Sequence, residues 1–334
     1  MVLHRSFPAL VVRRADDGSA VCGVETLTKN DLPPGDVLIE VECSSLNYKD
    51  ALATRAAPGV VRQLPHVPGI DCAGTVAESG STQFRAGEAV LVTGYDLGSG
   101  SWGGYSAFVR VPAEWVVTLP AGLSLREAMI YGTAGFTAAQ CVGAIQHHGI
   151  WPAAGEVVVT GASGGVGSVA VALLAKLGYT VTAVTGKPAQ AKLLQQLGAH
   201  RIIPREEVVD HSDKPLLPAR WAAAVDTVGG HTLATLLRST DHRGCVAACG
   251  LVGGDELPLT VYPFILRGVT LAGIDSAKCP REPRLEIWRK LAAEWNVIER
   301  LQPFVREVAL VDVPREVERM LAGQNSGRIL VLPR

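Results

Sequence analysis

The sequence predicts an α/β protein of two domains, a doubly wound parallel sheet and a compact β-barrel-like unit. Three observations support this prediction. The chain has 334 residues, enough for two domains of about 150 residues each. Strand and helix patterns alternate between residues 156 and 274, as in the repeated β-α-β units of a parallel sheet. Before residue 123 the pattern is one of short β-rich runs separated by glycine and proline.

The composition excludes several classes of function. Hydrophobic residues make up 48% of the chain and charged residues 19%, which favours sizeable cores over disorder. There are 31 Lys and Arg against 32 Asp and Glu, without a long run of one sign, which argues against a nucleic-acid-binding or membrane-surface protein. The 36 glycines follow no G-X-Y repeat and are typical of turns that approach a ligand closely. An enzyme or cofactor-binding protein is therefore favoured.

The cysteines and the apolar segments predict a cytoplasmic protein. The seven cysteines are scattered and odd in number, which is typical of a reducing compartment. The apolar run at residues 7–12 is too short for the core of a signal peptide. Residues 157–175 contain no charge, but four glycines lie in the first half of this segment. It therefore predicts a strand, a turn and a buried helix instead of a membrane span.

The first domain is expected at residues 1–123. Its strands are expected at 36–43, 72–78, 88–93, 105–111 and 115–119. Residues 297–334 contain strand patterns at 305–311 and 328–332 around a helix at 314–322. We expect this C-terminal segment to return to the first domain and complete its sheet.

The second domain is expected at residues 124–296, from a helix at 124–147 to an amphipathic helix at 284–296. Its strands are expected at 156–160, 180–185, 200–203, 222–227, 244–249 and 269–274, with helices at 165–177, 188–197 and 230–238. The last strand is apolar and should lie at the sheet edge, which predicts edge-to-edge pairing into a homodimer. The cleft between the two domains is the expected active site.

A glycine-rich turn at residues 160–167 (TGASGGVG) joins a predicted strand to a predicted helix. The dinucleotide-binding pattern G-x-G-x-x-G fits it best in the frame Ala162, Gly164 and Gly167, with alanine in the first place. Gly164 and Gly165 would let the backbone N–H groups at the helix N-terminus reach a pyrophosphate. Gly167 would let the helix pack against the strand. The alternative is a tight turn that binds no ligand.

The end of the second strand distinguishes NADP from NAD. NAD-binding units usually place Asp or Glu there to hold the ribose 2′-hydroxyl, whereas this chain has Thr185, Gly186 and Lys187. A hydroxyl, an accessible backbone N–H and an ammonium group suit a 2′-phosphate, which favours NADP(H). Arg205, after the third strand, would supply a second cation. The alternative for Lys187 is a solvated lysine at the start of a helix.

Several motifs together resemble a known family. A small β-rich domain, a dinucleotide-binding unit and a returning C-terminal segment resemble the medium-chain dehydrogenase/reductases over essentially the whole chain. The motifs at 44–50 (SSLNYKD), 68–71 (PGID), 132–138 (GTAGFTA) and 273–276 (GIDS) resemble the NADPH-dependent acrylyl-CoA reductases of its zinc-free, quinone oxidoreductase-like branch. This resemblance implies a Rossmann domain and a GroES-like catalytic domain.

The resemblance also implies that no zinc takes part. Zinc-containing relatives carry a ligand cysteine where this chain has Asn47, and Gly-His-Glu where it has Gly69, Ile70 and Asp71. Ile70 cannot ligate a metal, and no C-x-x-C pair of a structural zinc site occurs. Without a Lewis acid a plain ketone is a poor hydride acceptor, whereas a conjugated enoyl thioester needs less help.

The implied function is NADPH-dependent reduction of the 2,3 double bond of acrylyl-CoA to propionyl-CoA, with an acyl-CoA as the small-molecule substrate. An NADPH:quinone oxidoreductase would share nearly every motif and remains open. So does a non-catalytic NADPH-binding protein, although polar residues in the expected cleft make it less attractive.

The resemblance implies particular site residues. Tyr48 would lie in a loop beside the nicotinamide as a proton donor, or would contact the cofactor without chemistry. Asn47 and Asp50 would orient that loop, although Asp50 could equally cap a helix. The implied cofactor contacts are Tyr48, Ser163, Gly164, Gly165, Val166, Thr185, Gly186, Lys187, Arg205, Leu251, Ile265, Ser276 and Asn325.

Some of these positions, and several basic residues near the expected cleft, also have a structural explanation that involves no ligand. Leu251 and Ile265 could be core residues instead of cofactor contacts. Basic residues near the expected cleft are candidates for the phosphates of CoA, although each could lie on a solvated face: Arg55, Arg62, Arg267, Lys278 and Arg281.

Overall fold

The computed structural model describes residues 6–334, which form two compact units. The first unit comprises the chain up to residue 133 together with residues 277–292 and 305–334. The second comprises residues 134–276 and 293–304. Residues 1–5, which the sequence analysis assigned to the first domain, lie outside the described residues.

The second unit is built on a six-stranded parallel sheet. Its strands lie in the order β10 (Arg201–Pro204), β9 (Val181–Thr185), β8 (Val157–Val159), β11 (Trp221–Asp226), β12 (Thr240–Ala248) and β13 (Thr270–Gly273). The first strand in the sequence is central, and the chain reverses direction across the sheet there. This order is that of a doubly wound sheet, so the predicted fold class is confirmed.

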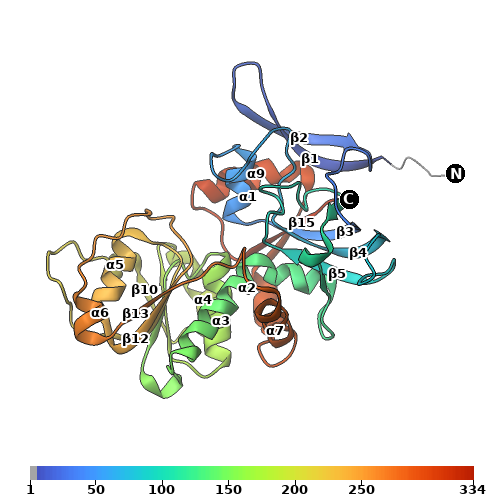
Figure 1. The fold of residues 1–334 in the computed structure, drawn as a ribbon. Coiled ribbons are helices and arrows are strands. Elements are labelled where there is room, and N and C mark those ends of the chain that lie inside the picture. Colours follow the sequence, from blue (N-terminus) through green and yellow to red (C-terminus); the bar gives the residue numbers. More distant parts are fainter. Residues whose placement is uncertain (1–5) are drawn as a thin grey trace. The chain divides into compact units, whose positions relative to one another are not determined.

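Helices cover both faces of this sheet. Figure 1 shows α3 (Gly165–Lys176) and α4 (Ala191–Leu197) on one side of the strands, and α5 (Gly230–Ser239) and α6 (Tyr262–Arg267) on the other. A short helix, α8 (Ile298–Leu301), packs against α3. Parallel strands need such crossover helices, and here the helices cover both faces of the sheet. Because a central strand is then buried on both faces, β8 consists of three buried valines.

One helix, α2 (Leu125–His147), is long and apolar enough by length and composition to cross a membrane. However, 78% of its apolar stretch is buried inside the protein, and Gly132 interrupts it with a non-helical φ of 51°. Burial in the core therefore accounts for its apolar character. The uncharged segment 157–175 consists of β8, a turn and α3, as the sequence predicts.

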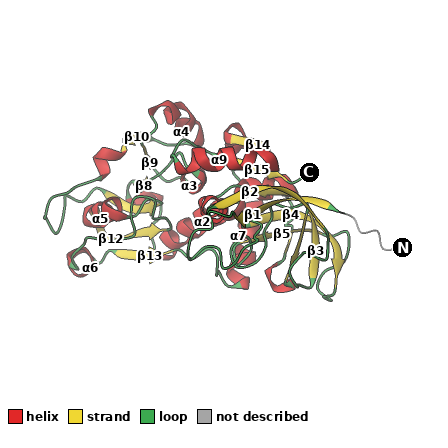
Figure 2. Ribbon diagram, turned by 90° about the horizontal axis from the view of Figure 1, so that it is seen from above, coloured by secondary structure: helices red, strands yellow, loops and turns green. Residues whose placement is uncertain are grey.

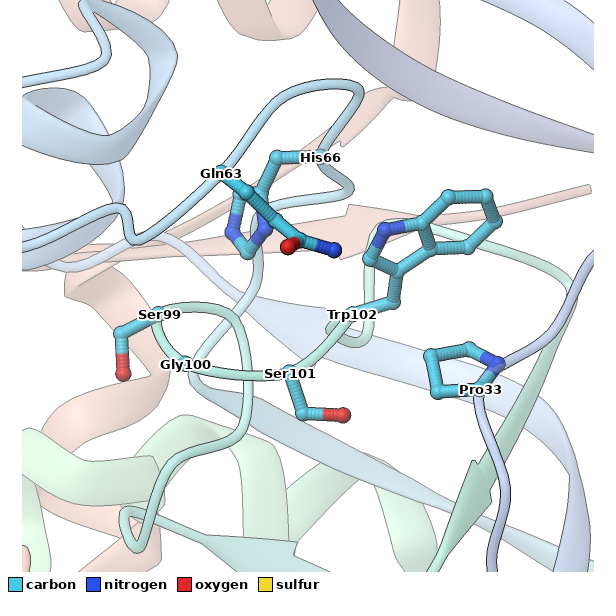
Figure 3. Close-up of a pocket in the computed structure, with 7 residues that line it drawn as sticks. All are labelled: Pro33, Gln63, His66, Ser99, Gly100, Ser101 and Trp102. Atoms are coloured by element: carbon cyan, nitrogen blue, oxygen red, sulfur yellow. The ribbon is translucent and has the colours of Figure 1, made fainter.

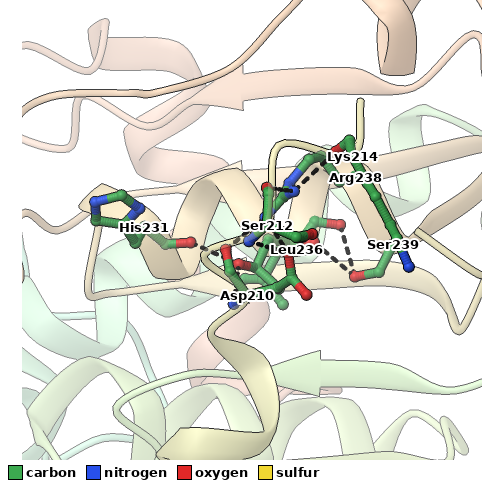
Figure 4. A network of polar contacts seen from close by, with 8 residues as sticks. Asp210, Ser212, Lys214, His231, Leu236, Arg238 and Ser239 are labelled. Atoms are coloured by element: carbon green, nitrogen blue, oxygen red, sulfur yellow. Dashed lines mark hydrogen bonds and ion pairs between the residues drawn. The ribbon is translucent and has the colours of Figure 1, made fainter. Parts of the chain in front are cut away.

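The segment before β11 wraps around a single buried arginine. Arg238, on α5, donates hydrogen bonds to the carbonyl oxygens of Ser212 and Lys214, both at 2.8 Å, and of Asp210 at 2.6 Å. It also forms an ion pair of 3.0 Å with the Asp210 carboxylate. Figure 4 shows these partners converging on the guanidinium. The arginine thus satisfies carbonyls that no sheet or helix could pair.

The first unit is built on a mixed seven-stranded sheet, seen from above in Figure 2. Its strands lie in the order β14 (Val305–Ala309), β15 (Arg328–Leu332), β3 (Val37–Ser45), β4 (Asp71–Ser79), β5 (Ala89–Thr93) and β7 (Val117–Thr118), and β6 (Phe108–Val111) pairs with β3. Leu330 lies opposite Ser45 in the register of β15 and β3. The C-terminal strands therefore belong to this sheet.

Two elements of the first unit were not predicted from the sequence. The first is an antiparallel hairpin of β1 (Phe7–Arg14) and β2 (Ala20–Leu27). The residues of β2 are mostly accessible, and their sequence shows little apolar periodicity. A short helix, α1 (Tyr48–Thr54), replaces the expected loop and packs against α9 (Val313–Leu321).

The division into units differs from the sequence-based boundaries at α7 (Arg281–Ala292), which groups with the first unit. The sequence analysis placed this helix, as residues 284–296, in the second domain. Its buried Arg284 donates to the carbonyl oxygen of Thr93 at 2.6 Å and to that of Ala277 at 3.1 Å. These contacts tie α7 to the end of β5, which sequence periodicity cannot reveal.

Candidate functional site

The turn between β8 and α3 has the backbone of a dinucleotide-binding loop. Gly161 has a φ of +56°, and a Cβ there would lie 2.2 Å from Thr227 Oγ1. A Cβ at Gly167 would lie 2.3 Å from the carbonyl oxygen of Gly161. Both positions therefore require glycine. The turn ends at Gly164, the N-cap of α3, where the first helical N–H groups lack intrahelical partners and can bind an anion.

A buried carboxylate, which the sequence analysis did not identify, braces this turn. Asp226, the last residue of β11, accepts hydrogen bonds from Thr160 Oγ1 at 2.6 Å and from the Gly229 N–H at 2.8 Å. The Thr227 N–H in turn donates to Thr160 Oγ1 at 3.0 Å. Burial raises the pKa of Asp226. The network joins the ends of β8 and β11 directly beside the glycine turn.

The residues predicted to bind a 2′-phosphate lie together at the end of β9. Ser163 Oγ and Thr185 Oγ1 are 3.0 Å apart, which joins the glycine turn to this strand end. The Lys187 N–H donates to Thr185 Oγ1 at 3.1 Å. Burial lowers the pKa of the Lys187 ammonium group, because it disfavours the charged form. A bound anion would stabilise that charged form.

Arg205 lies over the same strand end. A Cβ added to Gly186 would lie 3.3 Å from Arg205 Nε, so the absence of a side chain at Gly186 lets the guanidinium approach the backbone. The Arg205 side chain is 74% exposed, and its neighbour Glu206 accepts from Nε at 3.2 Å. An exposed pair of this kind contributes little, so the guanidinium can turn to a phosphate.

The remaining predicted cofactor contacts are not core residues. Leu251 follows β12 and is 63% exposed, and Ile265 on α6 is 68% exposed, so the core alternative is wrong for both. Ser276 is the last residue of its segment of the second unit. Asn325 belongs to the first unit, where its Nδ2 donates to the carbonyl oxygen of Glu316 at 2.9 Å.

Asn47 and Tyr48 lie at the start of α1, with Asn47 as its N-cap. The predicted loop is a helix because the Asp50 carboxylate accepts the Asn47 N–H at 2.8 Å, which is one half of a capping box. Tyr48 is 41% exposed, and its hydroxyl makes no hydrogen bond within residues 6–334. This hydroxyl can therefore donate to a bound molecule.

Asp50 is fully buried and holds two segments together. Besides the Asn47 N–H, its carboxylate accepts the N–H groups of Gly69 at 3.1 Å and Ile70 at 2.8 Å. Burial and the nearby Asp71 raise the pKa of Asp50 to about 7, against the effect of these hydrogen bonds. Asp50 therefore caps the start of α1, as the helix-cap alternative expected, and also binds the segment at Gly69 and Ile70.

Asp71 is the centre of a second buried cluster in this unit. Its Oδ2 accepts from Ser45 Oγ at 2.5 Å, Asn47 Nδ2 at 2.8 Å and the Thr133 N–H at 2.9 Å. Its Oδ1 accepts from Thr133 Oγ1 at 2.6 Å. The carboxylate thus fixes the Asn47 side chain on the inner side of the helix start that presents Tyr48.

The counter-charge of this cluster is Arg328, the first residue of β15. Its guanidinium donates to Ser45 Oγ at 2.9 Å and to the carbonyl oxygen of Ile130 at 2.8 Å. A Cβ at Gly132 would lie 2.5 Å from Ser45 Oγ and 2.6 Å from Asp71 Oδ2, so the kink in α2 makes room for the cluster. Sequence reasoning missed Arg328, because nothing in its local pattern marks it as buried.

The donor set of this cluster does not suit zinc. The amide of Asn47 is engaged by Asp71, and Ile70 provides an apolar side chain. No group of three His, Cys, Asp or Glu side chains among residues 6–334 could hold a metal ion. Zinc sites in proteins need three or four thiolate, imidazole or carboxylate ligands.

Family models match both parts of the chain. Residues 33–121 match the alcohol dehydrogenase GroES-like domain, and residues 165–293 match the zinc-binding dehydrogenase family. The second family is named for zinc, but the cluster around Asn47 and Asp71 lies outside the residues that it matches.

Curated relatives match nearly the whole chain. An acrylyl-CoA reductase of Ruegeria pomeroyi is 47% identical over 97% of this chain and 98% of its own length. A Bacillus subtilis protein for which quinone oxidoreductase activity has been proposed is 46% identical, over 96% of both chains.

Solved structures agree in fold and contain nicotinamide cofactors. The Escherichia coli K-12 protein YhdH with bound NADPH has a TM-score of 0.93 and 47% identity, and the match covers 98% of this chain and 100% of that one. A Bacillus subtilis structure with bound NAD has a TM-score of 0.94 and 45% identity, and covers 98% and 99% of the two chains.

Proposed function

Since the chain belongs to the medium-chain dehydrogenase/reductase family, we propose that it catalyses the NADPH-dependent reduction of acrylyl-CoA to propionyl-CoA. The observation that carries this proposal is the 47% identity to an acrylyl-CoA reductase over 97% of the chain. The donor set around Asn47 and Asp71, which does not suit zinc, is in keeping with it, because an enoyl thioester needs no metal to accept a hydride.

The glycine turn and the end of β9 fit NADPH. The N-terminus of α3, with Ser163, Gly164, Gly165 and Val166, would hold the pyrophosphate. Thr185, Gly186, Lys187 and Arg205 would hold the 2′-phosphate, since the Lys187 N–H contacts the Thr185 hydroxyl and the Arg205 side chain lies against Gly186. When bound, NADPH supplies the hydride that adds to Cβ of the thioester.

In this proposal Tyr48 is the hydrogen-bond and proton donor to the substrate. Its hydroxyl would donate a hydrogen bond to the thioester oxygen as negative charge develops there, and would then give a proton to Cα. Asn47 and Asp50 act through Tyr48, because Asp71 holds the Asn47 side chain while Asp50 fixes the first turn of α1. They are positioning residues in this scheme.

Substrate preference distinguishes the proposed acrylyl-CoA reductase from an NADPH:quinone oxidoreductase. We expect kcat/KM for NADPH oxidation to be at least 100-fold higher with acrylyl-CoA than with 1,4-benzoquinone in steady-state assays. A preference for benzoquinone would favour the quinone oxidoreductase alternative. Tight NADPH binding without turnover of either substrate would favour the non-catalytic alternative.

The assignment of NADPH is tested by Lys187→Ala. Loss of a charged contact to the 2′-phosphate costs about 1.5–3 kcal/mol. Affinity for NADPH should therefore fall roughly 10- to 150-fold, while that for NADH should stay within twofold. Isothermal titration with both cofactors measures this, and Lys192→Ala, an exposed lysine on the following helix, is the matched control. Equal losses for the two cofactors would contradict the assignment.

We further propose that two copies of the chain form a homodimer through the edge of the second unit. β13 lies at the sheet edge, and the exposed apolar side chains of the second unit include Val261, Leu266 and Val252. Light scattering should give twice the 35.2 kDa chain mass. Val261→Glu/Leu266→Glu should give the single mass, and Val311→Glu, on the first unit, should not. A wild-type mass of one chain would refute the dimer.

We also propose the cytoplasm as the site of action. All seven cysteines are free thiols, and five of them are buried in the hydrophobic core, a state that a reducing compartment preserves.

A further inference from the structure

The five basic residues that are candidates for binding the phosphates of CoA differ in the partners that their side chains already have. Arg267 donates to the carbonyl oxygens of Leu217, Arg238 and Thr240, and Arg281 donates to those of Glu114 and Val116. Arg55 is paired with Glu318. The first two guanidinium groups are thus committed to the backbone, and the third is neutralised. Arg62 and Lys278 differ from these three.

Arg62 and Lys278 share a single carboxylate. Arg62 lies 3.1 Å from Asp96 Oδ2, and Lys278 lies 3.0 Å from Asp96 Oδ1. The two basic side chains are 70% and 60% exposed, whereas Asp96 is 28% exposed. Two cations around one carboxylate leave a surplus positive charge that faces solvent. Because both cationic groups reach the same carboxylate, they lie close enough together to bind one anionic group, for which Asp96 competes.

Gly100 lets Arg62 lie against the loop that carries Asp96. A Cβ at Gly100 would lie only 2.9 Å from Arg62 Cζ and 3.1 Å from Asp96 Cβ. The Ser101 N–H donates to the carbonyl oxygen of Asp96 at 2.8 Å, which closes the loop. The cationic pair is thus seated on a folded loop instead of extending freely from the surface.

A cavity of about 110 Å³ opens beside this pair. Its lining is Pro33, Gln63, His66, Ser99, Gly100, Ser101 and Trp102, so Gln63 adjoins Arg62 and Gly100 lies under its guanidinium. In Figure 3 the Gln63 amide projects into the space between His66 and Trp102. An indole ring beside an amide and hydroxyl groups suits a purine, which needs a flat apolar contact and hydrogen bonds at its edge.

The same loop is packed rigidly against the segment that holds Tyr48 in place. A Cβ at Gly98 would lie 2.5 Å from the carbonyl carbon of Gly69, and one at Gly103 would lie 2.3 Å from the Gly69 oxygen. The Gly69 N–H binds Asp50, which also accepts the N–H of Asn47. One continuous set of contacts thus joins the cationic pair to the start of α1.

We propose that Arg62 and Lys278, with the adjoining cavity, bind the nucleotide end of CoA: its phosphates lie against the two cations and its adenine enters the cavity. This inference rests on the proposed function, because it assumes a CoA thioester as substrate. It predicts that the affinity for the CoA moiety, and not the chemical step, depends on these residues.

The test compares a long and a short thioester in the double variant Arg62→Gln/Lys278→Gln. KM for acrylyl-CoA should rise about tenfold with kcat unchanged, whereas KM for the acrylyl thioester of N-acetylcysteamine, which lacks the nucleotide, should not change. Raising the salt concentration should raise KM for acrylyl-CoA in the wild type and have less effect in the variant. Arg13→Gln, which removes an exposed arginine paired with Glu25, should behave like the wild type.

A binding measurement separates this inference from the proposed function. Adenosine 3′,5′-bisphosphate should bind the NADP-saturated wild type, and the double variant should bind it about tenfold more weakly, whether or not acrylyl-CoA is reduced. Asp96→Asn should not weaken this binding, because it removes a competing carboxylate. Equal KM changes for both thioesters, unchanged affinity in the double variant, or an equal loss in Asp96→Asn would overturn the assignment.

Discussion

Arg328→Met is expected to destabilise the protein by about 3–5 kcal/mol, because removing one partner of a buried charged network leaves the other uncompensated. Arg328 is 2% exposed and is joined to Asp71 through the hydroxyl of Ser45. The substitution leaves the Asp71 carboxylate in the interior without its counter-charge. Denaturant unfolding followed by fluorescence and circular dichroism measures the loss.

A matched substitution and a double variant distinguish burial from simple loss of an arginine. Arg126 forms an exposed pair with Glu307, and Arg126→Met should cost about 1 kcal/mol or less. Asp71→Asn combined with Arg328→Met should recover part of the stability lost in Arg328→Met alone, since the uncompensated carboxylate is removed. A stability of Arg328→Met within 1 kcal/mol of the wild type would refute the role of this charge pair.

Tyr48→Phe is expected to lower kcat for acrylyl-CoA by about 100-fold, the lower end of what a positioned proton donor contributes. KM for NADPH should change less than threefold, because the ring remains at the start of α1. The phenylalanine variant removes only the hydroxyl, which makes no hydrogen bond within the described part of the chain, so stability should be unaffected. Steady-state kinetics at saturating NADPH give both parameters.

Tyr262→Phe is the control for this substitution, since Tyr262 is a similarly exposed tyrosine at the start of α6 in the second unit. It should leave kcat within twofold of the wild type. If Tyr48→Phe weakens NADPH binding while kcat is retained, Tyr48 is a cofactor contact and water donates the proton.

Much of the fold could be predicted because its signals are local. The glycine turn at 160–167 lies between a buried strand and an apolar helix, and each of these has its own sequence pattern. Alternation of such patterns was enough to predict the doubly wound sheet. The hairpin of β1 and β2 has no comparable signal, since β2 is largely accessible and gains its order by pairing with β1.

The candidate site was predictable only in part. Lys187 and Arg205 follow consecutive strands of a parallel sheet, so their common location follows from the fold. The Asp71 cluster joins β3, β4, α2 and β15, and its partners come together only through tertiary packing. A buried Arg328 contradicts the usual exposure of arginine, and its burial is explained by the buried Asp71 carboxylate and by its hydrogen bonds to Ser45 and Ile130.

The most direct measurement follows the hydride itself. NADPH carrying deuterium at the transferred position should give propionyl-CoA with one deuterium at C3, detected by mass spectrometry, and in D₂O with ordinary NADPH the label should appear at C2. Formation of unlabelled propionyl-CoA from deuterated NADPH, or no propionyl-CoA while benzoquinone is rapidly reduced, would contradict the account.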